Sequence, residues 1–207
     1  MMRGRTMVTL ALDCSCVRGS VAVLADGEML FAEEFLAARS HSASLFFALE
    51  RARALVDRVD LVAVGLGPGS YAGTRIAISA AMGFQLGLGS RLVGLCSVSA
   101  LETEAREYLA VGDARRESYY FTRVREGICM DGPRLVEAAE LESLLGEYPG
   151  PAVHACEALP GFPRVTVALP LASTLARMAA SGRGILQEGV LEPVYLREPH
   201  ITQPRQR

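Results

Sequence analysis

Short apolar runs bounded by turn residues predict two groups of β-strands along the chain. Apolar runs or alternation over four to eight residues are typical of strands, whereas apolar residues at every third or fourth position are typical of helices. Each group has three strands, and its first strand ends in an aspartate, Asp13 in one group and Asp113 in the other. We interpret the two groups as a weak internal repeat. Their strands are predicted at residues 7–12, 19–24, 29–35, 108–112, 118–125 and 128–136.

Helical patterns and further apolar runs follow each group. Asp26-Gly27 and Glu126-Gly127 fall between alternating segments and predict hairpin turns. The tail from Leu191 contains three prolines and is expected to have little regular structure. Further strands are predicted at residues 61–65, 91–95, 152–155 and 164–167. Helices are predicted at residues 40–56, 73–88, 98–106, 138–145 and 171–181.

The stretch from Leu61 to Leu88 joins a buried strand to an uncharged helix through the loop Gly67-Pro68-Gly69-Ser70. No charged residue lies between Arg75 and Arg91, and a helix that is apolar on all sides is buried in a core or against another chain. Glycine in a helix costs about 1 kcal/mol relative to alanine, so several of them suggest a close approach. The small residues that share one side are Ala80, Gly83 and Gly87, with Gly73 at the start of the helix.

The helix at residues 40–56 has two apolar sides. Ser40, Ser42 or Ser44 could cap its N-terminus. The first apolar side consists of Leu45, Leu49, Ala52 and Val56. The second side consists of Ala43, Phe47 and Ala54, with Phe46 between the two sides. An apolar face of this kind is a candidate partner surface, and the alternative is that an adjacent loop or helix covers it.

Composition restricts the classes of protein that fit. With 207 residues, half of them hydrophobic, the chain can build one domain or two small halves. No apolar run reaches the roughly 20 residues needed to cross a bilayer, and the start lacks a signal-peptide segment, so a cytoplasmic location is expected. The net charge of −2 leaves no basic footprint for nucleic acid apart from Arg205 and Arg207. The five cysteines show no metal-binding spacing, and reduced thiols without a bound metal are expected.

The order of elements resembles the actin-like ATPase superfamily. Two halves, residues 1–106 and 107–207, each place a β-meander before helix–strand units. The predicted fold class is therefore α/β, a duplicated actin-like (ASKHA, ribonuclease H-like) fold with two βββαβα-type halves. In that architecture an aspartate of each half lies at a strand end near a phosphate-binding hairpin, here Asp13 and Asp113. Architecture alone establishes no activity.

Three motifs make the resemblance more specific. They are GPGSYAGTRI at 67–76, DAR at 113–115 and EPVYLR at 192–197, and together they resemble the TsaB (YeaZ) family. The family form of the first motif is usually GPGSFTG, so Tyr71 and Ala72 depart from it. His41 matches a histidine that opens the family's first helix. The similarity spans residues 7–197.

This resemblance implies a non-catalytic subunit. Family members pair with a larger relative, TsaD, which transfers a threonylcarbamoyl group to the adenosine beside the anticodon of certain tRNAs, and a small ATPase, TsaE, joins the complex. The resemblance implies contact with tRNA only through the partners, no membrane association, and a homodimer when the chain is alone. Family members dimerise through their first two helices, here residues 41–56 and 73–88. The implied interface residues are His41, Ala43, Phe46, Phe47, Ala54, Arg75, Ala80, Gly83 and Gly87.

The residues argue against two classes of enzyme. The first is a nucleotide-hydrolysing actin-like enzyme, which we keep as the alternative function. The loop at Gly67 matches neither GxxxxGK[ST] nor GxGxxG, and Ser70 is expected to cap the next helix instead of serving as a nucleophile. Asp13 is followed by Cys-Ser-Cys and not by the glycines that wrap a phosphate, so we expect a degenerate cleft with no catalytic residues and weak or no ATP or ADP binding.

A peptidase is the other class. The only histidines, His41, His154 and His200, form no zinc-binding or triad pattern. Two roles remain possible for Arg75, a contact with the partner and an ion pair within the chain.

Overall fold

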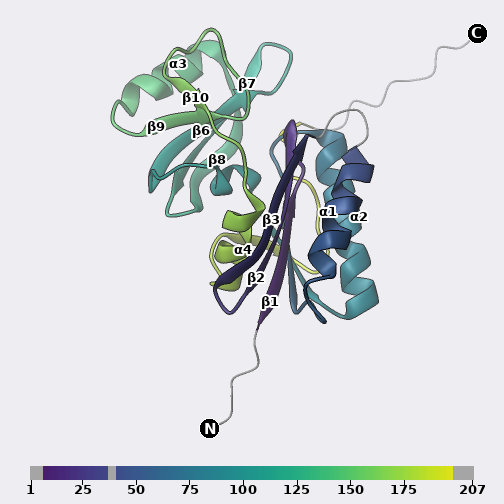
Figure 1. The fold of residues 1–207 in the computed structure, drawn as a ribbon. Coiled ribbons are helices and arrows are strands. Elements are labelled where there is room, and N and C mark those ends of the chain that lie inside the picture. Colours follow the sequence, from purple (N-terminus) through teal and green to yellow (C-terminus); the bar gives the residue numbers. More distant parts are fainter. Residues whose placement is uncertain (1–6, 37–40, 198–207) are drawn as a thin grey trace, which may run out of the picture.

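The computed structural model describes residues 7–36 and 41–197, which form two β-sheets with helices on their faces (Figure 1). The first sheet has the order β11-β5-β4-β1-β2-β3. Strands β1, β2 and β3 pair antiparallel, whereas β4 runs parallel to β1 and β5 parallel to β4. The bounds are β1 Val8–Asp13, β2 Arg18–Ala25, β3 Glu28–Leu36, β4 Leu61–Gly65, β5 Arg91–Leu95 and β11 Ile185–Glu188.

The second sheet repeats this plan with the order β10-β9-β6-β7-β8. Its first three strands again pair antiparallel, and β9 and β10 continue the sheet in parallel. The recurrence of three antiparallel and two parallel strands confirms the predicted duplicated α/β fold. The bounds are β6 Glu107–Asp113, β7 Ser118–Arg125, β8 Ile128–Glu137, β9 Ala152–Ala155 and β10 Val165–Val167.

The helices divide between the two sheets. Helices α1 (His41–Arg53) and α2 (Tyr71–Leu88) lie side by side on one face of the first sheet, and α4 (Ala172–Ala180) covers the other face (Figure 1). Helix α3 (Ala138–Glu147) packs on β7 and β8. The predicted helix at 40–56 ends earlier, at Arg53, and the one at 73–88 begins earlier, at Tyr71. Ser40 lies outside the described residues.

One predicted helix is wrong. Residues 98–106 do not form a helix, and only a 3-10 turn at Ser97–Ala100 is present. The backbone is extended at Leu101, which bridges to Pro170, and the backbone N–H of Glu102 donates to the Leu169 carbonyl at 2.8 Å. Pairing with a distant segment therefore replaces the local helical hydrogen bonds that the sequence pattern favours.

The C-terminal segment returns to the first sheet after the second sheet is complete. Helix α4 packs on β1, β2 and β4, and β11 pairs antiparallel with β5, a strand that the sequence analysis did not predict. The division of the chain into residues 1–106 and 107–207 stays a prediction, and α4 and β11 show that the later part also builds the earlier sheet.

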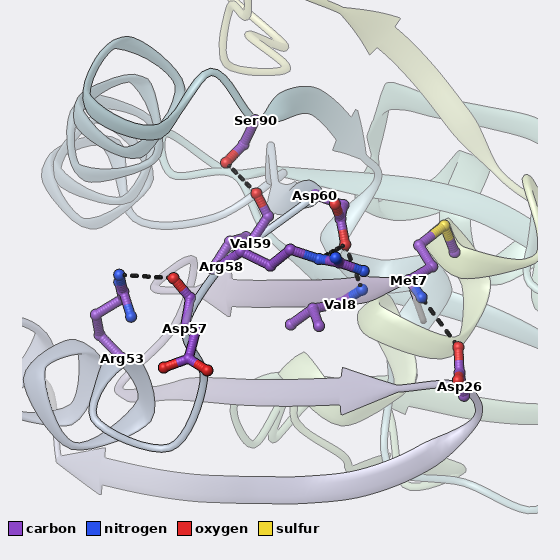
Figure 2. Close-up of polar contacts among 9 residues, drawn as sticks. All are labelled: Met7, Val8, Asp26, Arg53, Asp57, Arg58, Val59, Asp60 and Ser90. Atoms are coloured by element: carbon purple, nitrogen blue, oxygen red, sulfur yellow. Dashed lines mark hydrogen bonds and ion pairs between the residues drawn. The ribbon is translucent and has the colours of Figure 1, made fainter. Parts of the chain in front are cut away.

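Polar contacts hold the starts of the parallel strands at one end of the first sheet (Figure 2). The Asp60 carboxylate, directly before β4, accepts from the Val8 backbone N–H at 2.9 Å and from Arg58 Nε at 3.1 Å. The Ser90 hydroxyl, directly before β5, donates to the Val59 carbonyl at 2.7 Å. Because these contacts fix the amino ends of β1, β4 and β5, the carboxyl ends all lie at the opposite edge, where ligands bind in open α/β sheets.

A buried cluster joins the two halves. It lies between the end of β5 and strands β6 and β7, and Leu196 from the C-terminal segment packs against it. Its buried members are Cys96, Val98, Leu101, Tyr108, Ala110, Tyr120, Val124 and Ala168. No helix in the described ranges is long and apolar enough to cross a membrane.

Candidate functional site

The three sequence motifs meet at a cleft of about 910 Å³ between the two halves. Residues 68–70 of the first motif, 113–115 of the second and 193–197 of the third all line it. The cleft lies at the carboxyl ends of β1, β4 and β6, where the duplicated fold brings the ends of both sheets together. Segments that are more than 40 residues apart in sequence thus form one site. The other lining residues are Ser15, Cys16, Val17, Leu36, Leu66, Tyr71, Thr74, Gly112, Tyr120, Leu135, Cys156 and Glu157.

The Gly67–Ser70 loop is held by hydrogen bonds on both sides. The Gly67 N–H donates to Ser97 Oγ at 2.9 Å, and the Ser97 N–H donates to the Gly67 carbonyl at 2.8 Å. Gly67 has φ of +89°, a conformation that side chains rarely adopt, so glycine is required there. Ser70 Oγ accepts from the Gly73 N–H at 3.1 Å, which is the helix cap that the sequence predicts.

The first turn of α2 packs directly on the connection between β1 and β2. The Ser70 N–H donates to the Ser15 carbonyl at 2.5 Å. A Cβ on Gly69 would lie 2.0 Å from Ser15 O, and a Cβ on Gly73 would lie 2.0 Å from Cys14 O. The backbone of residues 14–15 therefore fills the place beside the helix N-terminus that a phosphate would need. The residues present do not fit the phosphates of a nucleotide at this position.

Asp13 is fully buried and does not line the cleft. Its Oδ1 accepts from the Ser15 N–H at 2.8 Å and from Ser15 Oγ at 2.7 Å. Its Oδ2 has no hydrogen-bond partner within the described part of the chain. Burial raises the pKa of Asp13, against the smaller lowering effects of Ser97 and Ser15. The Asp13 carboxyl group therefore stabilises the connection between β1 and β2 through Ser15. Because it is buried, it does not contact a molecule bound in the cleft.

The Asp13→Asn variant is expected to be more stable than the wild-type protein at pH 7–8. Because the pKa of Asp13 is raised on folding, its contribution to the free energy of unfolding is present below pH 3.8 and is lost as the pH rises through the folded-state pKa. Asparagine keeps an acceptor for Ser15 and does not ionise, so at pH 7–8 it avoids the cost of an unsatisfied buried charge, about 1–3 kcal/mol or more. Thermal unfolding between pH 4 and pH 8 measures the gain, which should shrink toward pH 4.

Asp57→Asn is the matched control, because Asp57 is exposed. We expect it to change the melting temperature little at any pH. A gain for Asp13→Asn that did not depend on pH, or no gain at all, would contradict the raised pKa.

Asp113 differs from Asp13 in lining the cleft. Its Oδ1 accepts from the Arg115 N–H at 2.6 Å, and its Oδ2 pairs with Arg115 Nη1 at 2.9 Å. Both carboxylate oxygens are therefore engaged by the DAR motif itself. Residues 115–117 all have positive φ without being glycine, so no glycine turn is available to wrap a phosphate here.

The loop after β9 adds bulk and negative charge to the cleft wall. Cys156 and Glu157 both line the cleft. A hydrogen bond with Cys16, together with burial, raises the pKa of Cys156, so this thiol stays protonated. A carboxylate and a neutral thiol at this wall disfavour a phosphate anion.

Most of the predicted interface residues lie on the exposed side of α1 or on α2, and Ala54 directly follows α1. Phe46 and Phe47 are 55% and 60% exposed, and Ala43 and Ala54 are exposed as well. No described loop or helix covers the two phenylalanines. Gly83 and Gly87 are open, with nothing within 4 Å of an added Cβ, whereas Ala80 is buried in the core of the first half. The side chain of His41 lies outside the described residues.

Further exposed apolar side chains on α2 were missed from the sequence. Leu86 is 83% exposed, and Met82 and Leu88 are also exposed. Because the helix carries no charge after Arg75, its pattern alone does not tell the solvent side from the core side. The core side is formed by Ala77, Ile78 and Ala81. We refer to the exposed apolar side chains of α1 and α2, namely Phe46, Phe47, Met82, Leu86 and Leu88, as the two-helix face.

Arg75 contacts the tyrosine one turn earlier on the same helix. Its guanidinium lies 4.8 Å from the centre of the Tyr71 ring and hydrogen-bonds to the Tyr71 hydroxyl. Neither contact is an ion pair within the chain, which was one of the two roles considered for Arg75 from the sequence. The described ranges also contain no group of three or more His, Cys, Asp or Glu side chains that could hold a metal ion.

Comparisons with known proteins identify relatives over most of the chain. The sequence profile of the family described as TsaD, tRNA N6-adenosine threonylcarbamoyltransferase, matches residues 35–185. An uncharacterized protein of Mycobacterium tuberculosis is 29% identical over 96% of both chains. The tRNA threonylcarbamoyladenosine biosynthesis protein TsaB of Haemophilus influenzae is 30% identical over 61% of this chain and 58% of its own. YeaZ from Pseudomonas aeruginosa superposes with a TM-score of 0.70 at 24% identity, covering 92% of this chain and all of that one, and shows the same fold.

Proposed function

The chain belongs to the TsaD family as a protein of the TsaB (YeaZ) type, and on that premise we propose that it acts in tRNA threonylcarbamoyladenosine biosynthesis as a non-catalytic subunit. In this role it binds a TsaD-type transferase through the two-helix face and holds that partner in its active conformation. The single observation that carries the proposal is an exposed apolar face on a chain whose own backbone fills the phosphate position of its cleft.

The two-helix face supports a protein partner. Two adjacent exposed phenylalanines and an 83% exposed leucine are unfavourable in water and are typical of a binding surface. Aromatic residues at the centre of an interface often contribute most of the binding free energy. When the chain is alone, the same face would join two copies in a homodimer, and the transferase would replace one copy in the working complex.

The proposal assigns the remaining chemistry to the partners. The cleft offers no glycine-rich phosphate cradle, Asp13 is withdrawn from it, and Asp113 is paired with Arg115. The subunit is therefore proposed to work without its own nucleotide or metal, with a TsaE-type ATPase supplying nucleotide hydrolysis. The net charge of −2 supports contact with tRNA through the partners, and the proposed location is the cytoplasm.

Reconstitution with purified components tests this function. The transferase, the TsaE-type ATPase, tRNA and the threonylcarbamoyl donor are combined with and without the chain, and modified adenosine is measured by mass spectrometry. We expect omission to lower the modification rate at least tenfold, and addition to restore it until the chain equals the transferase in amount. Full modification without the chain would overturn the proposal.

Incubating the purified chain with labelled ATP tests the alternative of a nucleotide-hydrolysing enzyme. Tight binding and turnover that Asp13→Asn abolished would favour that alternative over the scaffold role. We expect neither, because residues 14–15 fill the phosphate position.

A further inference from the structure

The C-terminal segment after β11 crosses from the first sheet to the cleft and is fixed at several points. The Val194 N–H donates to the Leu66 carbonyl at 2.8 Å, directly before the Gly67–Ser70 loop. Leu191 is buried in the core of the first half, and Val194 packs against that core. Leu196 packs against the cluster between the halves. Tyr195 therefore projects from a backbone that both halves hold in place.

Tyr195 contacts the first residue of α2. Its ring centre lies 5.8 Å from that of Tyr71, with the rings tilted by 36°. This separation is within the range of favourable aromatic pairs. Both rings are exposed to solvent and line the cleft, so the pair lies where the EPVYLR motif meets the start of the helix.

Tyr71 in turn holds Arg75. The guanidinium stacks over the Tyr71 ring at 4.8 Å and bonds to its hydroxyl. Arg75 is the only charged residue of α2, and it is exposed. Three side chains thus form a continuous row from the C-terminal segment to the single charge of a helix that carries the two-helix face.

We propose that Tyr195 is a positioning residue for partner binding, which acts through Tyr71 to hold the Arg75 guanidinium toward a carboxylate of the partner. The inference rests on the proposed function, because it deepens the role assigned to α2. An arginine side chain loses conformational freedom when it binds, and stacking beforehand reduces that loss. A single fixed cation at the end of an apolar face also sets the orientation of the partner, because a misplaced carboxylate would be left unpaired.

A double-mutant cycle tests the coupling. Dissociation constants for the complex with the TsaD-type transferase are measured by calorimetry for Tyr195→Ala, Arg75→Ala and the double variant. We expect Tyr195→Ala to weaken binding about five- to tenfold when Arg75 is present, but less than twofold in the Arg75→Ala background. Tyr195→Phe keeps the ring and should bind as the wild type does. Tyr71→Phe removes only the hydroxyl and should weaken binding only when Arg75 is present.

The salt dependence of binding distinguishes a positioning role of Tyr195 from a merely structural one, because a structural role would not change it. The wild-type dissociation constant should rise between 50 and 500 mM salt, and this rise should be smaller for both Arg75→Ala and Tyr195→Ala. Tyr195→Leu serves as a second variant if Tyr195→Ala fails to fold. Additive effects of Tyr195 and Arg75 substitutions, with an unchanged salt dependence, would overturn the inference.

Phe47→Asp separates this outcome from failure of the proposed function. If Phe47→Asp abolishes binding while the cycle is additive, the surface is correct and only the positioning role is wrong. If Phe47→Asp has no effect on binding, the partner uses a different surface, so the two-helix face assigned under the proposed function fails and the positioning role falls with it.

Discussion

Phe47→Asp is expected to weaken binding to the TsaD-type transferase at least about 100-fold, while the melting temperature stays within a few degrees of the wild-type value. Phe47 is 60% exposed, so a carboxylate there is solvated in the free chain and costs little stability. In the complex the same carboxylate would lose its water without gaining a partner, which is unfavourable in an apolar contact. Calorimetry and size measurement of the mixed proteins give the affinity and the assembly state.

Val167→Asp is the matched control for this variant. Val167 is 57% exposed and lies on β10 of the second sheet, away from α1 and α2. Val167→Asp introduces the same charge as Phe47→Asp at a side chain of nearly the same exposure, and it should leave binding of the transferase unchanged. Co-purification of the transferase with Phe47→Asp at wild-type yield would show that the partner uses a different surface. If the lone chain forms the homodimer proposed above, Phe47→Asp should convert it to a monomer.

Gly73→Ala is expected to destabilise the protein by about 3 kcal/mol or more, the upper range for overpacking a rigid site. The new Cβ would lie 2.0 Å from the carbonyl oxygen of Cys14, and this contact is with backbone that cannot rotate away. Either α2 or the β1–β2 connection must move. For a chain of this length, 1 kcal/mol corresponds to about 2–4 °C, so the melting temperature should fall by roughly 6–12 °C.

Gly83→Ala gives the opposite expectation within the same helix. Nothing lies within 4 Å of its added Cβ, and alanine is favoured over glycine in a helix by about 1 kcal/mol. The melting temperature should therefore rise by a few degrees. Equal effects of Gly73→Ala and Gly83→Ala would contradict the close packing of the α2 N-terminus on residues 14–15.

Local signals were sufficient to predict most of the fold. The hairpins at Asp26-Gly27 and Glu126-Gly127 were predicted from turn residues that take positive φ, and the structure has positive φ at all four. The short strand β11 was missed because it carries only four residues and owes its existence to pairing with β5, about 90 positions earlier. The predicted helix at 98–106 failed for a related reason, since Leu101 and Glu102 bond to residues near 170.

The candidate site was less accessible from the sequence. The resemblance singled out the three motifs, and helix periodicity placed Phe46 and Phe47 away from the core of α1. The stacking of Tyr195 on Tyr71 depends on where the C-terminal segment crosses the molecule, which no local pattern encodes. The exposed position of Leu86 was hidden because α2 has no charges with which to mark its solvent side.

The return of α4 and β11 to the first sheet has a consequence for synthesis on the ribosome. Buried residues on one side of that sheet, among them Ala11, Ala22 and Ala63, pack in a core that α4 completes with Leu175 and its neighbours. This surface stays uncovered until α4 has been translated, although its strands emerge first. The nascent polypeptide therefore cannot complete the core of its first sheet before the second sheet and α4 have been made, and both halves are expected to reach their final state together.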